Sequence, residues 1–249
     1  MRTTPASLTT IARAVDDRLA ALLEAETARW GNFDADLVAP IHEIGRLVLA
    51  GGKRLRPAFC YWGFVGSGGD ARSTSVIDAG GALELLHAFA LFHDDVMDGS
   101  TTRRGEPTTH TVFIEEHHKG SLAGEARRYG EGVAILVGDL AFVYADLLMK
   151  GASPEAWAMW NELRVELNFG QYLDMVGSRR ASDAARRPNA FVATRVASTR
   201  SSARYTSVHC SLTRLAEMDT WQRSRVTVCH SGMRSRCAMM CSVPSGKRR

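Results

Sequence analysis

Two carboxylates one helical turn apart are the feature of this sequence with the most evident chemistry. Asp94 and Asp98 are four residues apart, with Asp95 beside them, in a segment otherwise typical of a buried helix. An α-helix has about 3.6 residues per turn, so Asp94 and Asp98 are expected on one face. Their repulsion is unfavourable without a cation, and Mg²⁺ commonly takes one or two carboxylates with water and phosphate oxygens. The pair predicts a magnesium site or, taken alone, simply an acidic helix end.

Cationic residues flank these carboxylates in the sequence and favour the metal-site interpretation. Arg103 and Arg104 follow Asp98 closely, and Lys53 and Arg56 lie upstream in the run GGKRLRP. Arginine forks and lysine ammonium groups both bind phosphate oxygens. Cations beside a metal-binding cluster imply a polyanion that bridges them, and diphosphate is the natural candidate.

Glu84 and His87 extend the acidic stripe toward the start of the same apolar helix. Helical spacing places both of them on the face that carries Asp94 and Asp98. Because an unpaired charge is costly when it is buried, we expect each of these side chains to have a partner.

These motifs resemble the N-terminal half of the trans-isoprenyl diphosphate synthases, the polyprenyl synthetase family, and most of all its farnesyl and geranylgeranyl diphosphate synthases. The resemblance rests on three runs in this order and spacing: GGKRLRP at 51–57, LELLHAFALFHDDVMD at 83–98 and TTRRGEPT at 101–108. Two later runs, GDLAFVYADLL at 138–148 and FGQYLDM at 169–175, resemble the next two helices of the family. The resemblance covers roughly residues 35–197.

The resemblance implies two diphosphate sites. Asp94 and Asp98, with Asp95, would hold Mg²⁺ against an allylic diphosphate, and Arg103 would clamp that diphosphate. Four further residues would bind the diphosphate of isopentenyl diphosphate, namely Lys53, Arg56, His87 and Arg104. Two residues one turn apart would line the cavity from the opposite wall, namely Gln171 and Asp174. Asp139 and Asp146 are either cavity residues or structural ones, and the structural interpretation is preferred.

The implied reaction is head-to-tail prenyl transfer. Metal ions and arginine neutralise the departing diphosphate, an apolar cavity excludes water from the carbocation, and the double bond of isopentenyl diphosphate attacks before a proton is lost. In the family, bulky residues just before the first Asp-rich motif set the product length. Phe89 is therefore either the floor of the cavity, which implies a medium-length product of about geranylgeranyl length, or ordinary core packing.

The spacing of apolar residues predicts that almost everything before residue 195 is helical. Ser153 and Pro154 are typical of a helix start, with serine as the cap and proline in the first turn. The predicted helices span residues 8–30, 35–50, 54–65, 74–97, 132–150 and 154–176, with a loop at 99–109. We expect an all-α fold, and the resemblance implies a helical bundle of the isoprenoid synthase type with a central catalytic cavity, incomplete at its C-terminus.

Charge and cysteine are distributed unevenly along the chain. The formal net charge of +4 arises from residues 195–249, which hold eleven of the 31 basic residues and two of the 27 acidic ones. Four of the five cysteines also lie there, at spacings that lack the CxxC pair of a zinc site. We predict a partial synthase domain at 1–197 and a basic Ser/Arg/Cys-rich tail at 198–249.

The family has a second Asp-rich motif, preceded by a segment that contains lysine, and neither is present in this sequence. Back-translation of residues 229–243, read two bases later, permits Pro-Leu-Gly-x-Ala-x-x-Leu-Arg-Asp-Asp-Val-Leu-Gly, which has the spacing of that motif. The tail is accordingly interpreted as out of frame from about residues 196–199, or else as disordered. Either interpretation predicts impaired activity for the chain as translated.

Several other functions and settings were weighed. The apolar run 132–149 contains Asp139 and Asp146, which argues for a buried helix and against a membrane span. An odd cysteine count and no signal segment favour the cytoplasm. Nucleic acid is not an expected partner, since only the tail is basic, and the family implies a homodimer. The alternatives are a class I terpene cyclase, which needs no second diphosphate site, and a non-catalytic partner subunit of an intact synthase.

Four further histidines are expected to have no role in the chemistry. His93 and His110 are interpreted as incidental. His117 and His118, in the run EEHHK, are interpreted as part of a solvated helix face.

Overall fold

A computed structural model describes residues 6–180 of the chain. All of them belong to the first of two compact units, Met1–Asp219, and the second unit is Thr220–Arg249. The predictions about the tail therefore lie outside the described residues. The described elements are α1 (Ala6–Gly31), the 3₁₀ turn η1 (Ala35–Leu37), α2 (Val38–Val48), α3 (Leu55–Gly66), α4 (Ser75–Met97), β1 (Thr102–Arg103), β2 (Glu106–Pro107), α5 (Thr109–Lys119), α6 (Ala126–Leu148) and α7 (Pro154–Arg180). The prediction of an all-α fold is confirmed.

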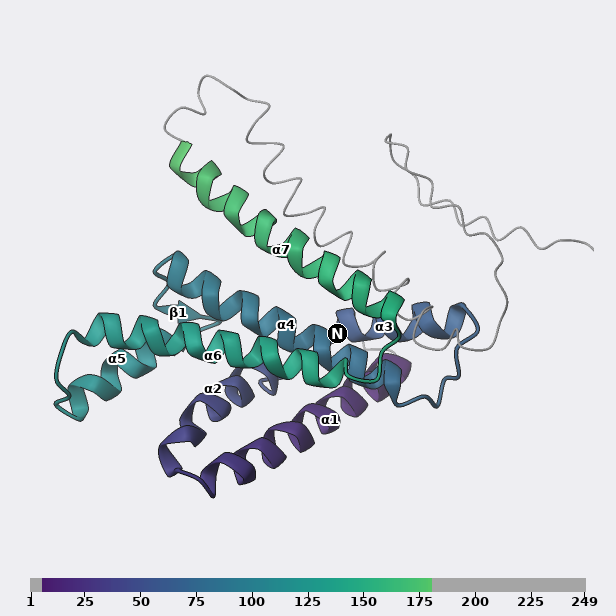
Figure 1. Cartoon of the computed structure of the whole chain (residues 1–249), viewed down its shortest axis with the longest axis horizontal. Helices are drawn as coiled ribbons and strands as arrows, with labels where there is room; N and C mark the ends of the chain where they lie inside the picture. The colour runs from purple at the N-terminus through teal and green to yellow at the C-terminus, as the bar shows by residue number, and fades with distance from the viewer. Residues whose placement is uncertain (1–5, 181–249) are drawn as a thin grey trace, which may run out of the picture. The chain divides into compact units, whose positions relative to one another are not determined.

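Helix α4 is the central element of the bundle, and it packs along α6 (Figure 1). Its sequence is apolar on almost every face, which is typical of a helix surrounded by others. Helices α1, α2 and α3 also contact α4, and α5 lies against α6. Gly81 on α4 allows a close approach, because a Cβ atom there would press on the side chain of Leu148 on α6.

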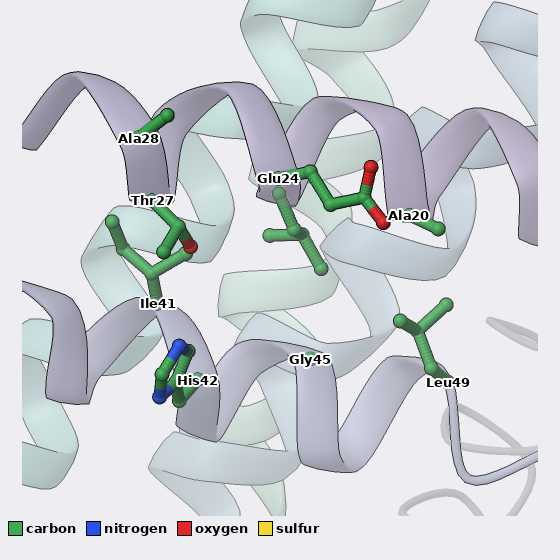
Figure 2. Close-up of a pocket in the computed structure, with 9 residues that line it drawn as sticks. Ala20, Glu24, Thr27, Ala28, Ile41, His42, Gly45 and Leu49 are labelled. Atoms are coloured by element: carbon green, nitrogen blue, oxygen red, sulfur yellow. The ribbon is translucent and has the colours of Figure 1, made fainter.

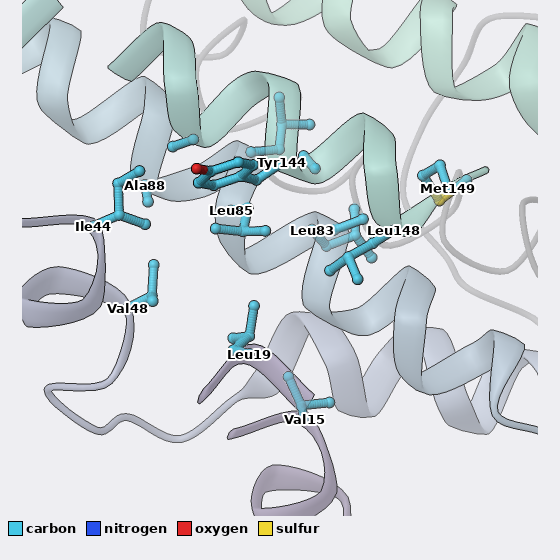
Figure 3. Close-up of a cluster of buried hydrophobic side chains, with 14 of the residues drawn as sticks. Val15, Leu19, Ile44, Val48, Leu83, Leu85, Ala88, Tyr144, Leu148 and Met149 are labelled. Atoms are coloured by element: carbon cyan, nitrogen blue, oxygen red, sulfur yellow. The ribbon is translucent and has the colours of Figure 1, made fainter. Parts of the chain in front are cut away.

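The core is formed by buried side chains from α1 to α7, and Figure 3 shows the part of it where α1, α2, α4 and α6 meet. Val15 and Leu19 of α1 and Leu85 of α4 are fully buried there, and Tyr144 of α6 lies beside them. Each fully buried leucine or valine contributes roughly 1.5–3 kcal/mol through the loss of apolar surface to water. This packing fixes α4, on which the carboxylates and His87 are carried.

Helix α7 begins as predicted, and its first turns are fixed to α6. The backbone N–H of Ala156 donates to the hydroxyl of Ser153, and the helix starts at Pro154. Asp146 of α6 accepts a hydrogen bond of 2.7 Å from the indole of Trp160 and two of 2.8 Å from Arg164. The structure thus gives Asp146 a structural role, and α7 is positioned opposite the acidic end of α4.

The segment between α4 and α6 differs from the prediction in three ways. The loop predicted at 99–109 contains the short β1–β2 hairpin, α5 was not predicted, and α6 begins at Ala126, well before residue 132. The interpretation of His117 as a solvated residue was wrong. Its side chain is buried, and Nε2 lies 3.3 Å from the carbonyl oxygen of Ala123. His110 is also buried, beside the hydroxyl of Thr108.

Among the described residues, α4 is the helix that is long and apolar enough to cross a membrane. The apolar run at 132–149, which was predicted to be a buried helix, lies in α6 and not in α4. In the most apolar window of α4, 56% of the residues are buried inside the bundle. A mostly buried helix of this kind is what the core of a globular α-helical protein contains.

Candidate active site

The side chains of Arg103 and Arg104, which are adjacent in a short hairpin, reach two different sites. Strands β1 and β2 pair antiparallel, with Arg103 opposite Glu106, so the turn consists of Arg104 and Gly105. Both turn residues have positive φ, 55° and 88°, as in the type I′ turns that join twisted hairpins. Glycine adopts this conformation freely, whereas Arg104 adopts it at some cost. The hairpin follows α4 directly, and it brings Arg103 to the acidic end of that helix and Arg104 to a pocket beside the middle of the helix.

Arg103 binds the acidic motif from this hairpin. Its Nε lies 3.0 Å from both carboxylate oxygens of Asp95, and its Nη2 lies 2.7 Å from Asp95 Oδ1 and 3.3 Å from Asp94 Oδ2. These hydrogen bonds, with Asp95 first among the causes, raise the pKa of Arg103. Asp95 is buried, and Arg103 neutralises and orients it.

Asp94 and Asp98 face a third carboxylate, Asp174, from α7. Burial and then the charges of Asp94 and Asp95 raise the pKa of Asp98. Burial followed by Asp94 and Asp98 raises the pKa of Asp174. Gln171 donates a hydrogen bond of 2.8 Å from Nε2 to Asp94 Oδ1. Carboxylates from two helices therefore crowd one space with more negative charge than Arg103 offsets.

This acidic cluster fits a magnesium ion, although within residues 6–180 no three His, Cys, Asp or Glu side chains are close enough to form a complete ligand set. Mg²⁺ does not need such a set, because it keeps several waters and completes its shell with phosphate oxygens. Asp94 and Asp98 are the oxygen donors it prefers. Burial is the largest cause of the raised pKa values of Asp98 and Asp174, and the neighbouring carboxylates add repulsion that a cation would relieve.

The cationic residues line a pocket of about 170 Å³ beside the middle of α4. It contains Lys53 from the segment before α3, Arg56 from the first turn of α3, His87 from α4, and Arg104 from the hairpin. Burial, then the charges of Arg56, Arg104 and Arg103, lowers the pKa of His87 to about 3. The imidazole is therefore neutral at physiological pH, in a pocket whose other named members are cations.

Two charged residues of this pocket were not assigned a role from the sequence. Arg54 is buried, and its Nη1 lies 2.7 Å from Oε2 of Glu84. Glu84 was expected on one stripe with Asp94 and Asp98. Along that stripe it lies about 15 Å from Asp94, because ten residues of helix separate them, and it lines the cationic pocket. A carboxylate on an otherwise apolar helix was the available signal that a cation would face it.

Phe89 lies in an aromatic group between α4 and α6. Its ring centroid is 4.6 Å from that of His93 and 4.7 Å from that of Phe142. The ring of His93 in turn rests on Gly138, where a Cβ atom would collide with it. Neither the cavity-floor role nor the packing role of Phe89 is excluded by these contacts.

A separate hollow of about 410 Å³ lies between α1 and α2 (Figure 2). Its lining is mostly apolar, and the polar side chains in it are Glu24, Thr27 and His42. A diphosphate needs several cations, and this lining includes no lysine or arginine. The described residues that line this hollow therefore offer no cationic group to a phosphate, unlike those of the cationic pocket.

Comparison with known proteins decides the family. The polyprenyl synthetase family model matches residues 39–219. The chain belongs to this family. The match extends beyond residue 197, where the sequence analysis had placed the end of the synthase domain, and residues 181–219 lie outside the described part.

Individual relatives agree with the family. The chain is 35% identical over 134 residues to a short chain isoprenyl diphosphate synthase of Methanothermobacter thermautotrophicus, which covers 52% of this chain and 36% of the relative. It is 35% identical over 150 residues to a geranylgeranyl diphosphate synthase of Mycobacterium tuberculosis, covering 58% of this chain and 35% of the relative. The matched region thus spans about a third of the length of these relatives.

A solved structure shares the fold. The crystal structure of geranylgeranyl pyrophosphate synthase from Corynebacterium glutamicum, complexed with isoprenyl diphosphate and magnesium, aligns with a TM-score of 0.72 and 31% identity. The alignment covers 85% of this chain and 61% of that one. The α-helical fold of the family is therefore present in the described residues.

Proposed function

We propose that this chain carries the two diphosphate sites of a Mg²⁺-dependent prenyltransferase that condenses isopentenyl diphosphate with an allylic diphosphate, head to tail. The observation that carries the proposal is that two adjacent arginines of the hairpin reach two different sites. Arg103 lies on the acidic cluster, whereas the adjacent Arg104 lines the cationic pocket. One short turn thus places a cation beside each of two sites that differ in charge.

The acidic cluster is the site for the allylic diphosphate. Asp94 and Asp98 would hold Mg²⁺, which when bound supplies positive charge to neutralise a departing diphosphate. Arg103, oriented by Asp95, adds a fixed guanidinium beside the same diphosphate. Gln171 holds Asp94 from α7. These residues prepare the cleavage of the bond between the allylic carbon and the diphosphate oxygen.

The cationic pocket is the site for isopentenyl diphosphate. Lys53, Arg56 and Arg104 offer charge without any metal, and neutral His87 can donate one further hydrogen bond. A terpene cyclase handles a single diphosphate and has no need of this second pocket. The pocket therefore favours the transferase. The magnesium and isoprenyl diphosphate in the Corynebacterium glutamicum enzyme are compatible with this assignment.

Phe89 is proposed as the floor beneath the allylic chain, with a product of about geranylgeranyl length. It lies five residues before Asp94, more than one helical turn away from the acidic cluster, and its ring packs against that of Phe142 on α6. An aromatic ring at this depth would stop a growing chain.

The homodimer is likewise a proposal, supported by an exposed apolar stripe on α6 that contains Leu136, Val143 and Leu147.

We also propose that the 249-residue chain turns over slowly on its own, because the printed sequence has a single Asp-rich motif, at 94–98. Product formation from labelled isopentenyl diphosphate, farnesyl diphosphate and Mg²⁺ tests this point. We expect a trace of product or none. Turnover within about tenfold of typical enzyme values, 1–10³ per second, would overturn this proposal and leave the two-site assignment intact.

Calorimetric titration of the unaltered chain tests the two-site proposal independently of turnover. We expect isopentenyl diphosphate to bind with or without Mg²⁺, since its pocket is cationic. Farnesyl diphosphate is expected to bind much more tightly when Mg²⁺ is present, since its site is acidic. Failure of both ligands to bind, or an equal Mg²⁺ requirement for both, would overturn the proposal.

A further inference from the structure

We propose that Arg54 is a positioning residue for the isopentenyl diphosphate pocket, holding Lys53 and Arg56 in place through Glu84 and Asp16 without binding the diphosphate itself. The inference rests on the proposed function of this pocket. It adds to that function a residue which neither the sequence motifs nor the comparisons single out.

All three nitrogens of the Arg54 guanidinium donate to groups of the protein. Nε lies 2.8 Å from Asp16 Oδ1, Nη1 lies 2.7 Å from Glu84 Oε2, and Nη2 contacts both Asp16 Oδ1, at 2.6 Å, and the carbonyl oxygen of Val48. The side chain is 5% exposed. Two carboxylates thus face one cation, so Arg54 adds no net positive charge for a phosphate to bind.

These contacts join three helices at one point. Asp16 belongs to α1, Val48 is the last residue of α2, and Glu84 lies on α4 one turn before His87. Arg54 itself precedes α3 in a left-handed backbone conformation, with φ 44° and ψ 43°. A residue with a side chain rarely adopts this conformation. The two carboxylates and the Val48 carbonyl therefore hold a backbone bend that the chain would otherwise avoid.

The bend matters because the neighbours of Arg54 line the pocket on either side of it. Lys53 and Arg56 both line the pocket, as do Glu84 and His87 of α4. A rigid link from Arg54 to Glu84 fixes the start of α3 against α4, and thereby sets the spacing between the two cations and the imidazole. Arg54 therefore acts through its neighbours.

Lysine cannot replace arginine in this role. Its ammonium group is a single point, whereas the planar guanidinium carries five N–H donors in a fixed fork. Arg54→Lys keeps the buried charge but cannot serve Asp16, Glu84 and Val48 at once. The chain also offers a matched control, the Arg18–Asp78 ion pair of 2.6 Å, which joins the same helices α1 and α4 and does not line the pocket.

The test is calorimetric titration of isopentenyl diphosphate into the unaltered chain and five variants, each first checked for helical content and thermal midpoint. The variants are Arg54→Lys, Glu84→Gln, the double variant that combines these two changes, Arg18→Lys and Lys53→Met. We expect Arg54→Lys and Glu84→Gln each to weaken binding about tenfold or more, and the double variant to be little worse than either, because both break one link. Arg18→Lys should bind as the unaltered chain does. Mg²⁺-dependent binding of farnesyl diphosphate should be unchanged in Arg54→Lys.

The outcomes separate the inference from the function on which it rests. If Lys53→Met weakens binding and a folded Arg54→Lys does not, the positioning role is wrong and the pocket assignment stands. If Arg54→Lys and Arg18→Lys lower the thermal midpoint alike and leave affinity unchanged, Arg54 is merely structural. If the unaltered chain does not bind isopentenyl diphosphate, the proposed function and the inference are both overturned. Should Glu84→Gln fail to fold, Arg54→Lys alone decides the result.

Discussion

Gln171 on α7 donates a hydrogen bond of 2.8 Å to Asp94 on α4, a residue 77 positions earlier in the chain. The bond joins the two walls of the acidic cluster. Asp174 lies one turn beyond Gln171 on α7, and burial followed by the charges of Asp94 and Asp98 raises its pKa. An uncharged amide at this point offers a donor to Asp94 without adding to the repulsion.

Replacing that amide by a carboxylate should make the cluster depend on a cation. In Gln171→Glu a fourth acid joins Asp94, Asp98 and Asp174, and the donor to Asp94 is lost. We expect the thermal midpoint to fall by about 2–5 °C in the absence of divalent metal, and Mg²⁺ to restore most of the loss. The conservative change Glu162→Gln, on the exposed face of the same helix, should behave as the unaltered chain. A midpoint for Gln171→Glu that does not respond to Mg²⁺ would contradict the metal assignment.

The ionised carboxylate of Asp98 should destabilise the folded protein at neutral pH. Its pKa is raised by burial and by Asp94 and Asp95, so the folded state disfavours the ionised carboxylate relative to the unfolded chain. This penalty is present above the ordinary pKa of 3.8 and disappears below it. Asp98→Asn is therefore expected to raise the thermal midpoint at pH 7 by about 1–2 °C, a small effect because Asp98 is exposed to solvent.

The stabilisation by Asp98→Asn should vanish in acid and should not occur at an isolated carboxylate. Thermal melts at pH 7 and pH 3 measure the first point. Asp17→Asn, at an exposed position of α1, provides the control for the second. Equal effects of the two substitutions at pH 7 would show that the acidic cluster carries no strain.

Most of the helices could be predicted because their buried positions are occupied by large apolar residues. The helix predicted at residues 8–30 corresponds to α1, Ala6–Gly31. The predicted start of α7 at Ser153 and Pro154 is confirmed. Helix α5 could not be found in this way. Three of its buried side chains, His110, Phe113 and His117, follow helical spacing, but two of them are histidines, which an apolar pattern does not register.

The start of α6 was missed for a related reason. Its first buried residues, Ala126, Gly130 and Ala134, are small and follow one another at every fourth position. At Gly130 a Cβ atom would collide with Ile114 and with the backbone of α5, so close helix contact requires a small residue there. Sequence hydrophobicity alone gives little weight to such a stripe.

The composition of the site could be predicted more fully than its internal links. Lys53, Arg56, His87 and Arg104 were grouped by the resemblance, and the structure brings them into one pocket. The partners of Arg54 could not be predicted, because Asp16 and Glu84 are distant in sequence and an ion pair between helices leaves no periodic signal. The roles of all these residues in binding remain predictions.

His87 should make the protein sensitive to mild acid. Its pKa is near 6.5 when the chain is unfolded. In the folded state burial, and then the charges of Arg56 of α3 and of Arg104 and Arg103 of the hairpin, lower this pKa to about 3. Between these values the unfolded chain binds a proton that the folded chain does not, so stability falls as the pH drops below 6.5. From pH 7 to pH 5 the loss due to His87 should be about 1–2 kcal/mol.

Urea unfolding of His87→Gln at the two pH values measures this contribution. The variant should lose about 1–2 kcal/mol less stability than the unaltered chain over that range. His118→Gln, at an exposed position of α5, should show no such relief. Identical pH dependence in His87→Gln and the unaltered chain would mean that His87 is not held neutral.

Phe89→Ala should enlarge the space beneath the allylic site. Removing the ring from its contacts with His93 and Phe142 is expected to cost about 2–3 kcal/mol of stability, because Phe89 is only partly buried. In titrations with Mg²⁺, affinity for geranylgeranyl diphosphate should rise relative to that for farnesyl diphosphate. Phe113→Ala, a buried phenylalanine of α5, is the control for stability alone. An unchanged ratio of affinities in Phe89→Ala would assign this residue to core packing.

The central claim is that one hairpin serves two separate diphosphate sites, and selective loss of each site tests it most directly. Lys53→Met and Asp98→Asn would be titrated with isopentenyl diphosphate, and with farnesyl diphosphate in the presence of Mg²⁺. We expect Lys53→Met to weaken the binding of isopentenyl diphosphate by about tenfold or more and to leave the binding of farnesyl diphosphate unchanged, and Asp98→Asn to do the reverse. If either substitution weakens both ligands equally, the two pockets are not independent diphosphate sites and the account is wrong.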